Sequence, residues 1–362
     1  MATIRHLFLL LFTGATWLLS AQPVTVDVRV EGVAPGSRIT LAEAGFSDGK
    51  SVPDTTLVFP EGKDSIQITT GKSGRMLALL LQGGDGVRQQ TEFFAEPGES
   101  YAVDGRADDF AGAKISGGLY DTGGLDEITA MKHRLDSLLD RGASAQEIAQ
   151  AAKDLVFAKE KFIVYHPNNA YSAMLISDLI TQVSKYTTVD RVRRLYDSLN
   201  GKARNTYAGE VANEEMYLLL GSSEGASAPR FTLTSFDGEL ISPSHFRGKW
   251  VLLYFWASWC GACREDFPEL RRWYEKYHPR GLEMIGLACR DEDAAWREAV
   301  SGVQLPGVQV RADEEIAGQE SVTRTFLVSS LPQAILVDPA GKIVFRGQPS
   351  QLPEKLKEVF GQ

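Results

Sequence analysis

The 362-residue chain has few cysteines and no concentration of charge of one sign. Only three cysteines are present, and none lies in residues 22–259, so disulfides cannot stabilise the N-terminal half. The chain has 38 basic and 47 acidic residues, a formal net charge of -9, without a long run of either sign. A nucleic-acid partner is therefore not expected.

The chain also lacks an apolar run of the roughly 20 residues that a membrane-spanning helix needs. Its start combines Arg5, an apolar core at residues 7–19 and the small-residue ending LSA, which together are typical of an export signal. We predict a signal peptide at residues 1–21, cleaved after Ala21, and no membrane span in the mature chain. The alternative is an uncleaved anchor. Export would place the protein in the periplasm or cell envelope.

A chain of this length exceeds one typical domain, and its N-terminal part reads as β-structure. VTVDVRVE, residues 24–31, alternates apolar and polar side chains, which predicts a half-buried strand. Similar short runs follow at short intervals, separated by glycine, proline and aspartate. We predict an antiparallel β-sandwich domain of unknown function at residues 22–118.

The apolar period then changes from two to that of a helix. Residues 119–220 are predicted to be a helical segment, in which SAQE, from Ser144 to Glu147, looks like a capping box that starts one helix. GSSEGASAP, residues 221–229, has the composition of a flexible linker.

Residues 230–362 alternate strand and helix patterns, which predicts an α/β domain. WVLLYFWA and LEMIGLA have the composition of buried strands, and CREDFPELRRWYEKY and DEDAAWREAV that of helices. FTLTSFDGELIS and QAILVDPAGKIVFRG are typical of hairpins.

Two of the three cysteines lie where the first buried strand meets the first helix, in FWASWCGACREDFP. The free backbone N–H groups and the positive dipole end of that helix favour a thiolate at Cys260, the expected nucleophile. Cys263 follows nearly one helical turn later, close enough to form a disulfide with it, and is the expected resolving thiol.

This arrangement resembles the thioredoxin fold, and specifically the exported TlpA/ResA-like thiol–disulfide oxidoreductases. The resemblance covers about residues 228–362 and depends on three motifs in order, which are APRFTLTSFDGE, GKWVLLYFWASWCGACREDFPEL and SSLPQAILVDPAGKIVFRG. The preceding two-thirds resembles the uncharacterised β-rich and helical region found before such modules in many envelope proteins.

The resemblance implies roles for four further residues. Trp259 would be the aromatic residue that flanks the active site, and Pro268 the proline that bends the active-site helix. Pro332 would be a cis-proline facing the disulfide, and Leu331 would pair through its backbone with an extended substrate segment.

The sequence departs from the family pattern at two places. The active-site loop is Gly261-Ala262 where the commonest motif has Gly-Pro, which restores a backbone donor near the sulfurs. Tyr254 occupies the position at which thioredoxins themselves carry a buried acid. Proton handling could pass to Asp266, where the family usually has glutamate. The alternative is that Asp266 only complements the helix dipole.

The other cysteine, histidine and acidic residues have simpler interpretations. A structural disulfide or a zinc site is the alternative for Cys260 and Cys263, but His245 and His278 provide no zinc-ligand spacing, so no metal is expected. Cys289 is interpreted as a small buried side chain, or else as a third reactive thiol. Trp256 and Trp296 are expected in the core, and DED at residues 291–293 at a solvated helix start.

These patterns together predict an exported thiol–disulfide oxidoreductase with no cofactor. It would reduce disulfide-bearing envelope proteins through the Cys260–Cys263 couple and be recharged by an upstream membrane thiol reductase. The alternative direction is oxidation of substrate thiols by the same couple. One alternative is an envelope partner-binding protein in which the thioredoxin-like domain is a scaffold. Another is a thiol peroxidase, although SWCGAC lacks the expected Thr-x-x-Cys context.

Overall fold

The computed structural model describes residues 22–44, 53–83, 88–303, 305–314 and 318–361. The predicted signal peptide, residues 1–21, lies outside the described residues. In the described part of the chain, no helix has both the length and the apolar character needed to cross a membrane. The chain forms two compact units, Met1–Thr122 and Gly123–Gln362, described separately below.

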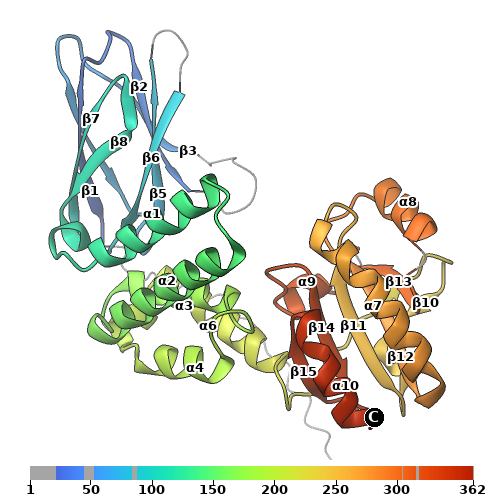
Figure 1. Cartoon of the computed structure of the whole chain (residues 1–362). Coiled ribbons are helices and arrows are strands. Elements are labelled where there is room, and N and C mark those ends of the chain that lie inside the picture. The colour runs from blue at the N-terminus through green and yellow to red at the C-terminus, as the bar shows by residue number, and fades with distance from the viewer. Residues whose placement is uncertain (1–21, 45–52, 84–87, 304, 315–317, 362) are drawn as a thin grey trace, which may run out of the picture. The chain divides into compact units, whose positions relative to one another are not determined.

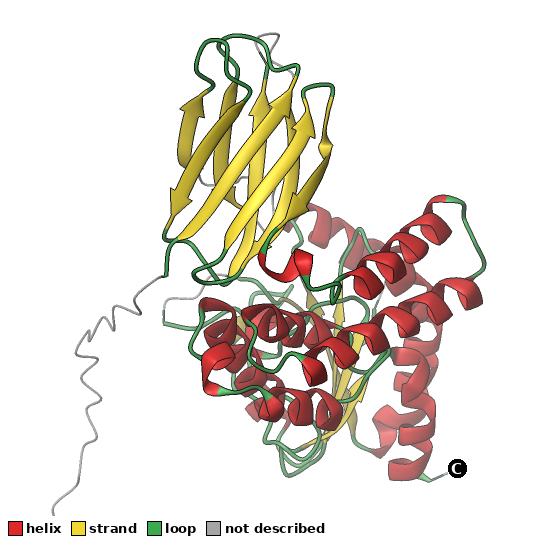
Figure 2. Ribbon diagram, turned by 90° about the vertical axis from the view of Figure 1, so that its left-hand side faces the viewer, coloured by secondary structure: helices red, strands yellow, loops and turns green. Residues whose placement is uncertain are grey.

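The first unit is a sandwich of two four-stranded sheets, ordered β4-β1-β7-β8 and β3-β2-β5-β6 (Figures 1 and 2). The alternating valines of β1 are buried in the core between the sheets, while the intervening polar residues face outward. The strands are β1 Val24–Glu31, β2 Arg38–Glu43, β3 Pro53–Val58, β4 Ser65–Thr70, β5 Arg75–Gln82, β6 Arg88–Ala95, β7 Ser100–Arg106 and β8 Asp109–Ser116.

The predicted β-sandwich is therefore present, but it is not purely antiparallel. β1 pairs with β7 in parallel, with Val26 beside Tyr101, whereas the other strand pairs of the two sheets are antiparallel. A parallel pair needs a long crossover connection, and here the chain between β1 and β7 supplies β4 and the strands of the second sheet. Alternation within a strand does not reveal the direction of its neighbour.

The second unit begins with the helical segment. Its helices are α1 Asp126–Asp140, α2 Ala145–Tyr165, α3 Ala170–Thr181, α4 Val189–Ser198, α5 Gly201–Arg204 and α6 Tyr207–Gly221, and the short helix η1 Gly118–Asp121 precedes them at the end of the first unit. The predicted capping box is confirmed. Ser144 is the N-cap of α2, its Oγ accepts from the Glu147 N–H, and its own N–H donates to Glu147 Oε2 at 3.0 Å.

The predicted flexible linker is instead hydrogen-bonded along its length. The Gly225 N–H donates to Ile343 O at 2.8 Å, the Ile343 N–H to Ala226 O at 2.9 Å, and the Ala228 N–H to Gly341 O at 2.9 Å. These bonds partner the free edge of β15 (Ile343–Gly347), whose backbone groups would otherwise be left open. The flexible linker was predicted from amino-acid composition alone. Composition cannot show that residues 225–228 pair with the edge of β15, which lies more than 100 residues later in the chain.

The α/β domain predicted for the C-terminal part is confirmed. Its five-stranded sheet has the order β13-β12-β11-β14-β15, with β11 parallel to β12 and antiparallel to β14 (Figure 1). Its elements are β9 Leu233–Thr234, β10 Leu240–Ile241, η2 Pro243–Phe246, β11 Trp250–Trp256, α7 Gly261–Tyr277, η3 His278–Arg280, β12 Leu282–Ala288, α8 Asp293–Val303, β13 Val308–Arg311, α9 Val322–Thr325, β14 Gln333–Val337, β15, η4 Pro349–Gln351 and α10 Leu352–Phe360.

Each face of this sheet has its own apolar core. Residues of α7, α8 and α10 pack on one face, and residues of β9, β10 and α9 pack on the other. Among the residues that the structure describes, both cores are built from side chains between Ala228 and Phe360, and none comes from the helical segment.

Polar groups of the helical segment contact this domain. Arg324 forms an ion pair with Glu214 of α6, Gln351 Nε2 donates to Ser184 O at 3.4 Å, and Ser184 Oγ donates to Arg346 O at 3.2 Å. The exposed ion pair between Arg324 and Glu214 contributes about 0–1 kcal/mol.

A variant lacking residues 22–220 is therefore expected to fold and to keep its redox activity. Both apolar cores and the edge-pairing residues 225–228 remain in it. Circular dichroism and thermal unfolding would measure whether the variant folds, and reduction of a model disulfide would measure its redox activity. As a matched control, a variant that also lacks residues 221–229 should have a lower Tm, because it exposes the edge of β15. An insoluble or inactive fragment 221–362 would contradict the predicted domain boundary.

Candidate active site

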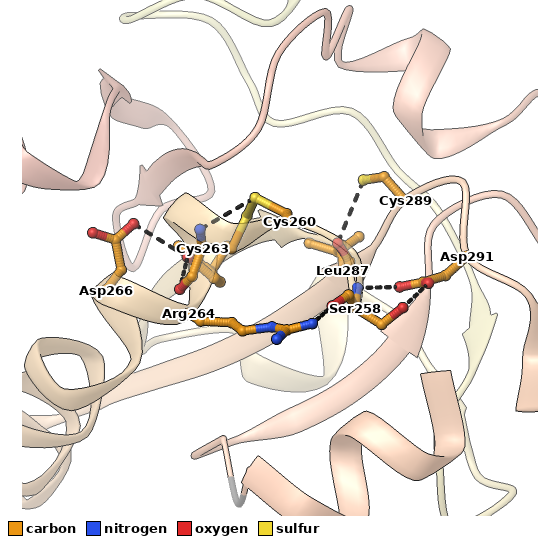
Figure 3. Close-up of a disulfide and its surroundings, with 9 residues drawn as sticks. Ser258, Cys260, Cys263, Arg264, Asp266, Leu287, Cys289 and Asp291 are labelled. Atoms are coloured by element: carbon orange, nitrogen blue, oxygen red, sulfur yellow. Dashed lines mark hydrogen bonds between the residues drawn. A yellow bond between two sulfur atoms is a disulfide. The ribbon is translucent and has the colours of Figure 1, made fainter. Parts of the chain in front are cut away.

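The site is formed where β11 runs into α7. β11 is an apolar strand between β12 and β14, and Val251 to Trp256 are buried. Cys260 is the N-cap of α7, and its Sγ accepts from the Cys263 N–H at 3.2 Å. The two cysteines form a disulfide (Figure 3). This is the strand-to-helix position that the sequence predicted for the pair.

The two sulfurs differ in their accessibility. Cys260 is 7% exposed and Cys263 is 0% exposed, so a substrate can reach only the first. Gly261 and Ala262 between them are exposed. Trp259 is 57% exposed, and its Nε1 donates to Arg290 O at 3.0 Å, which fixes one edge of the indole beside the disulfide. Trp259 therefore lies exposed beside the active-site disulfide, at the flanking position expected for it.

Leu331 and Pro332 enter the site from the neighbouring strand. Their peptide bond is cis, as the family resemblance implies. They lead directly into β14, whose first residue, Gln333, pairs with Phe255 of β11. This register places Pro332 at the end of β11 from which the chain continues to Cys260. Leu331 is partly buried and packs against both apolar cores.

Asp266 lies on α7 beyond Cys263, and a tyrosine of β11 holds it. Tyr254 Oη lies 3.2 Å from Asp266 Oδ2 and 3.2 Å from Cys263 O. Figure 3 shows Asp266 on the same side of the disulfide as Cys263. The aspartate, which replaces the glutamate usual in the family, is therefore linked through the Tyr254 hydroxyl to the backbone of the resolving cysteine.

The surroundings raise the pKa values of both Asp266 and Tyr254. Burial raises the pKa of Asp266, the hydrogen bond from Tyr254 lowers it, and the charge of Glu265 raises it, with a net increase. The pKa of Tyr254 is also raised, chiefly by burial and then by the Asp266 charge. Tyr254 therefore stays protonated over the physiological range.

One acidic residue of the site was missed by the sequence analysis. The prediction of a solvated helix start at residues 291–293 is wrong for Asp291, which is 8% exposed. Its Oδ2 accepts from the Ser258 N–H at 2.7 Å and its Oδ1 from Ser258 Oγ at 2.5 Å (Figure 3). Asp291 therefore fixes the turn that precedes Cys260.

The sequence did contain a signal for this contact. Ser258 follows β11 and Asp291 follows β12, and these strands are parallel neighbours. Their carboxyl ends therefore meet at one edge of the sheet, where ligand sites of α/β folds usually lie. Arg264 completes the turn by donating from Nη2 to Ser258 O at 2.6 Å.

Cys289 is the one cysteine outside the disulfide, and it is fully buried. Its Sγ donates to Leu287 O at 3.4 Å, and burial raises the pKa of its thiol to about 12. A neutral, buried thiol is a poor nucleophile. These properties favour the interpretation of Cys289 as a small core side chain. Trp256 and Trp296 are likewise buried in the core.

The described residues contain no cluster of three or more histidine, cysteine or acidic side chains that could hold a metal ion. His278 Nδ1 lies 3.0 Å from Leu282 O, and His245 Nδ1 lies 3.0 Å from Ser242 Oγ. Both histidines thus have local partners, and the cysteine pair is disulfide-bonded.

Comparisons with known proteins show which proteins this chain is similar to. A family model described as the AhpC/TSA family matches residues 225–346. The thiol-disulfide oxidoreductase ResA of Bacillus cereus is 32% identical over 154 residues, which cover 42% of this chain and 83% of that relative. ResA of Bacillus thuringiensis is 34% identical with the same coverage.

A solved thiol-disulfide oxidoreductase from Bacteroides fragilis is 34% identical and covers 37% of this chain and 98% of its own, with a TM-score of 0.34. The residues that the family model matches, 225–346, include the CxxC disulfide at the N-terminus of α7. The chain belongs to the TlpA/ResA-like thiol–disulfide oxidoreductases of the thioredoxin fold.

Proposed function

We propose that this oxidoreductase is exported and reduces disulfides of proteins in the cell envelope. The observation that carries the proposal is the accessible Cys260 sulfur at the N-terminus of α7, with the fully buried Cys263 as its partner. The signal-like pattern of residues 1–21 supports export. The exposed Trp259 and the segment Leu331–Pro332 offer a surface for an extended substrate.

The reaction consists of two thiol–disulfide exchanges. The Cys260 thiolate attacks one sulfur of the substrate disulfide, and the other substrate sulfur leaves as a thiolate. Cys263 then loses its proton and attacks the Cys260 sulfur of the mixed disulfide. The second substrate sulfur leaves with the bonding electrons, and the 260–263 disulfide forms. The substrate gains two electrons, and the protein must be reduced before another cycle.

Asp266 takes up the proton of Cys263 in this scheme. Cys263 is fully buried one turn inside α7, where burial disfavours its thiolate and the helix N-terminus helps it less than Cys260. The raised pKa of Asp266 makes its carboxylate a better proton acceptor than an exposed aspartate. Its contact through Tyr254 with the Cys263 backbone supports this role.

The electrons must come from outside the chain, because the third cysteine, Cys289, is buried and the chain offers no second dithiol. A membrane thiol reductase that exchanges disulfides with Cys260 would recharge the couple on the outer side of the membrane. The same exposed surface around Trp259 would serve the reductase and the substrate in turn, since both need access to the same sulfur.

The reduction potential tests the proposed direction of electron flow. We expect a value more negative than about -180 mV, within the range of reducing thioredoxin-fold proteins. Equilibration in glutathione and dithiothreitol redox buffers, followed by alkylation of free thiols and mass spectrometry, would measure it. A value near about -120 mV, typical of a strong thiol oxidant, would overturn the reductase proposal and indicate oxidation of substrate thiols instead.

A further inference from the structure

Tyr254 is a polar residue in an otherwise apolar strand. It lies in the middle of β11, is 0% exposed, and packs edge-on against Phe267 of α7, with ring centroids 6.4 Å apart. A buried hydroxyl needs a hydrogen-bond partner, and a phenylalanine would fill the same space without this cost. The hydroxyl therefore requires an explanation beyond packing.

The partners of this hydroxyl are both parts of the resolving machinery. Oη lies 3.2 Å from Cys263 O and 3.2 Å from Asp266 Oδ2. A phenol has one proton to donate and lone pairs with which to accept. It can therefore donate to only one of the two oxygens fully at a time, and it can accept from Asp266 when that carboxyl is protonated.

We propose that Tyr254 is a positioning residue for the resolving step, which holds Asp266 beside Cys263 in both protonation states of the carboxyl group. The inference rests on the proposed role of Asp266 as the proton acceptor. Before the transfer, the phenol donates to the carboxylate. After it, the phenol accepts from the carboxylic acid and turns its own proton to Cys263 O.

The proton and electron balance of the step is closed. The proton leaves Cys263 Sγ and binds a carboxylate oxygen of Asp266. The new thiolate forms the bond to Cys260 Sγ, the bond between Cys260 and the substrate sulfur breaks, and the substrate thiolate leaves with the electron pair. Asp266 later returns the proton to solvent. Tyr254 keeps one proton throughout and only changes its acceptor.

Few titratable groups shift the pKa of Asp266. In the disulfide form, the titratable groups among the described residues that shift the pKa of Asp266 are Tyr254 from β11 and Glu265 from α7, and in the reduced protein the Cys263 thiol joins them. The Tyr254 hydrogen bond is the one contribution that lowers the Asp266 pKa, while burial and Glu265 raise it. Without the Tyr254 hydroxyl, Asp266 would ionise only at higher pH. Near neutral pH, a smaller fraction of the protein would then have an ionised Asp266 that can accept the Cys263 proton.

Tyr254→Phe tests the proposal, because it removes the hydroxyl and keeps the ring. Reduced protein is mixed with excess disulfide-bonded peptide, and acid quenching at millisecond intervals measures formation and decay of the mixed disulfide from about pH 6 to 9. We expect formation to be unchanged. The rise of the decay rate with pH should move up by about one unit, which gives about tenfold slower decay on its acid side.

Two further variants separate the inference from its foundation. Asp266→Asn should slow the decay near neutral pH, and the double variant Tyr254→Phe/Asp266→Asn should match it, since the phenol acts through the carboxylate. Tyr277→Phe, which removes the hydroxyl of another buried tyrosine of the same core, is the matched control and should leave the profile unchanged.

Each outcome decides a distinct question. If Asp266→Asn decays as fast as wild type, Asp266 is not the proton acceptor, and the positioning role of Tyr254 fails with it. If Asp266→Asn is slow but Tyr254→Phe keeps the wild-type profile, only the inference about Tyr254 fails. Equal slowing at every pH, or further slowing in the double variant, would show a structural effect and also overturn it.

Discussion

Cys260→Ser is expected to abolish disulfide reduction, leaving only the rate of the external reductant. Cys260 is the accessible sulfur of the pair and lies at the N-terminus of α7, where the Cys263 N–H points at it. A serine hydroxyl stays protonated in this position and cannot open a disulfide. Reduction of insulin with dithiothreitol, followed by turbidity, measures the loss.

Cys289→Ala is the control for this experiment. It also removes one thiol, but that thiol is buried and takes no part in the disulfide. We expect wild-type turnover with a slightly lower Tm, because a small side chain is lost from the core. Activity retained in Cys260→Ser, or lost only in Cys289→Ala, would show that the chemistry does not start at Cys260.

Cys263→Ala is expected to stop the reaction at the mixed disulfide. The first attack needs only Cys260, whose contact with the backbone N–H of residue 263 survives the substitution. Release of substrate then depends on external thiol, which lacks the proximity of a neighbouring side chain. Turnover should fall by at least about a hundredfold and become proportional to the dithiothreitol concentration.

The trapped species provides the measurement. Intact-mass spectrometry after acid quenching should find close to one substrate molecule per protein, released by reduction and attached to Cys260. The double variant Cys260→Ser/Cys263→Ala should trap none. If Cys263→Ala turns over like wild type, Cys263 is not the resolving thiol, and a one-thiol mechanism would replace the one proposed. The same trap, applied to envelope extracts, would identify the substrates.

Local patterns were sufficient for several parts of the fold. The alternation of β1, the apolar run of β11 and the Ser144–Glu147 capping box each occupy a few consecutive residues, and all appear as expected. The CxxC pair was likewise placed at the start of α7 because a strand pattern stops and a helix pattern begins there. Such features depend on neighbours in the sequence.

Features that depend on distant neighbours were missed. The parallel pairing of β1 with β7, the attachment of residues 225–228 to β15 and the burial of Asp291 beside Ser258 each join segments far apart in the chain. β13 was missed because its four residues are too few for a clear pattern. The pairing of Tyr254 with Asp266 also needed the structure, although both residues had been singled out.

The rate at which the buried Cys289 is alkylated can report transient opening of the C-terminal domain. Since its thiol is inaccessible in the folded state, an alkylating reagent can modify it only during a transient opening that exposes the end of β12. In the oxidised protein Cys260 and Cys263 are disulfide-bonded and do not react with the reagent, so Cys289 is the one cysteine that can be alkylated. The dependence of its rate on denaturant would distinguish local fraying from global unfolding, and a slower rate with a bound partner would reveal whether that partner clamps the domain shut.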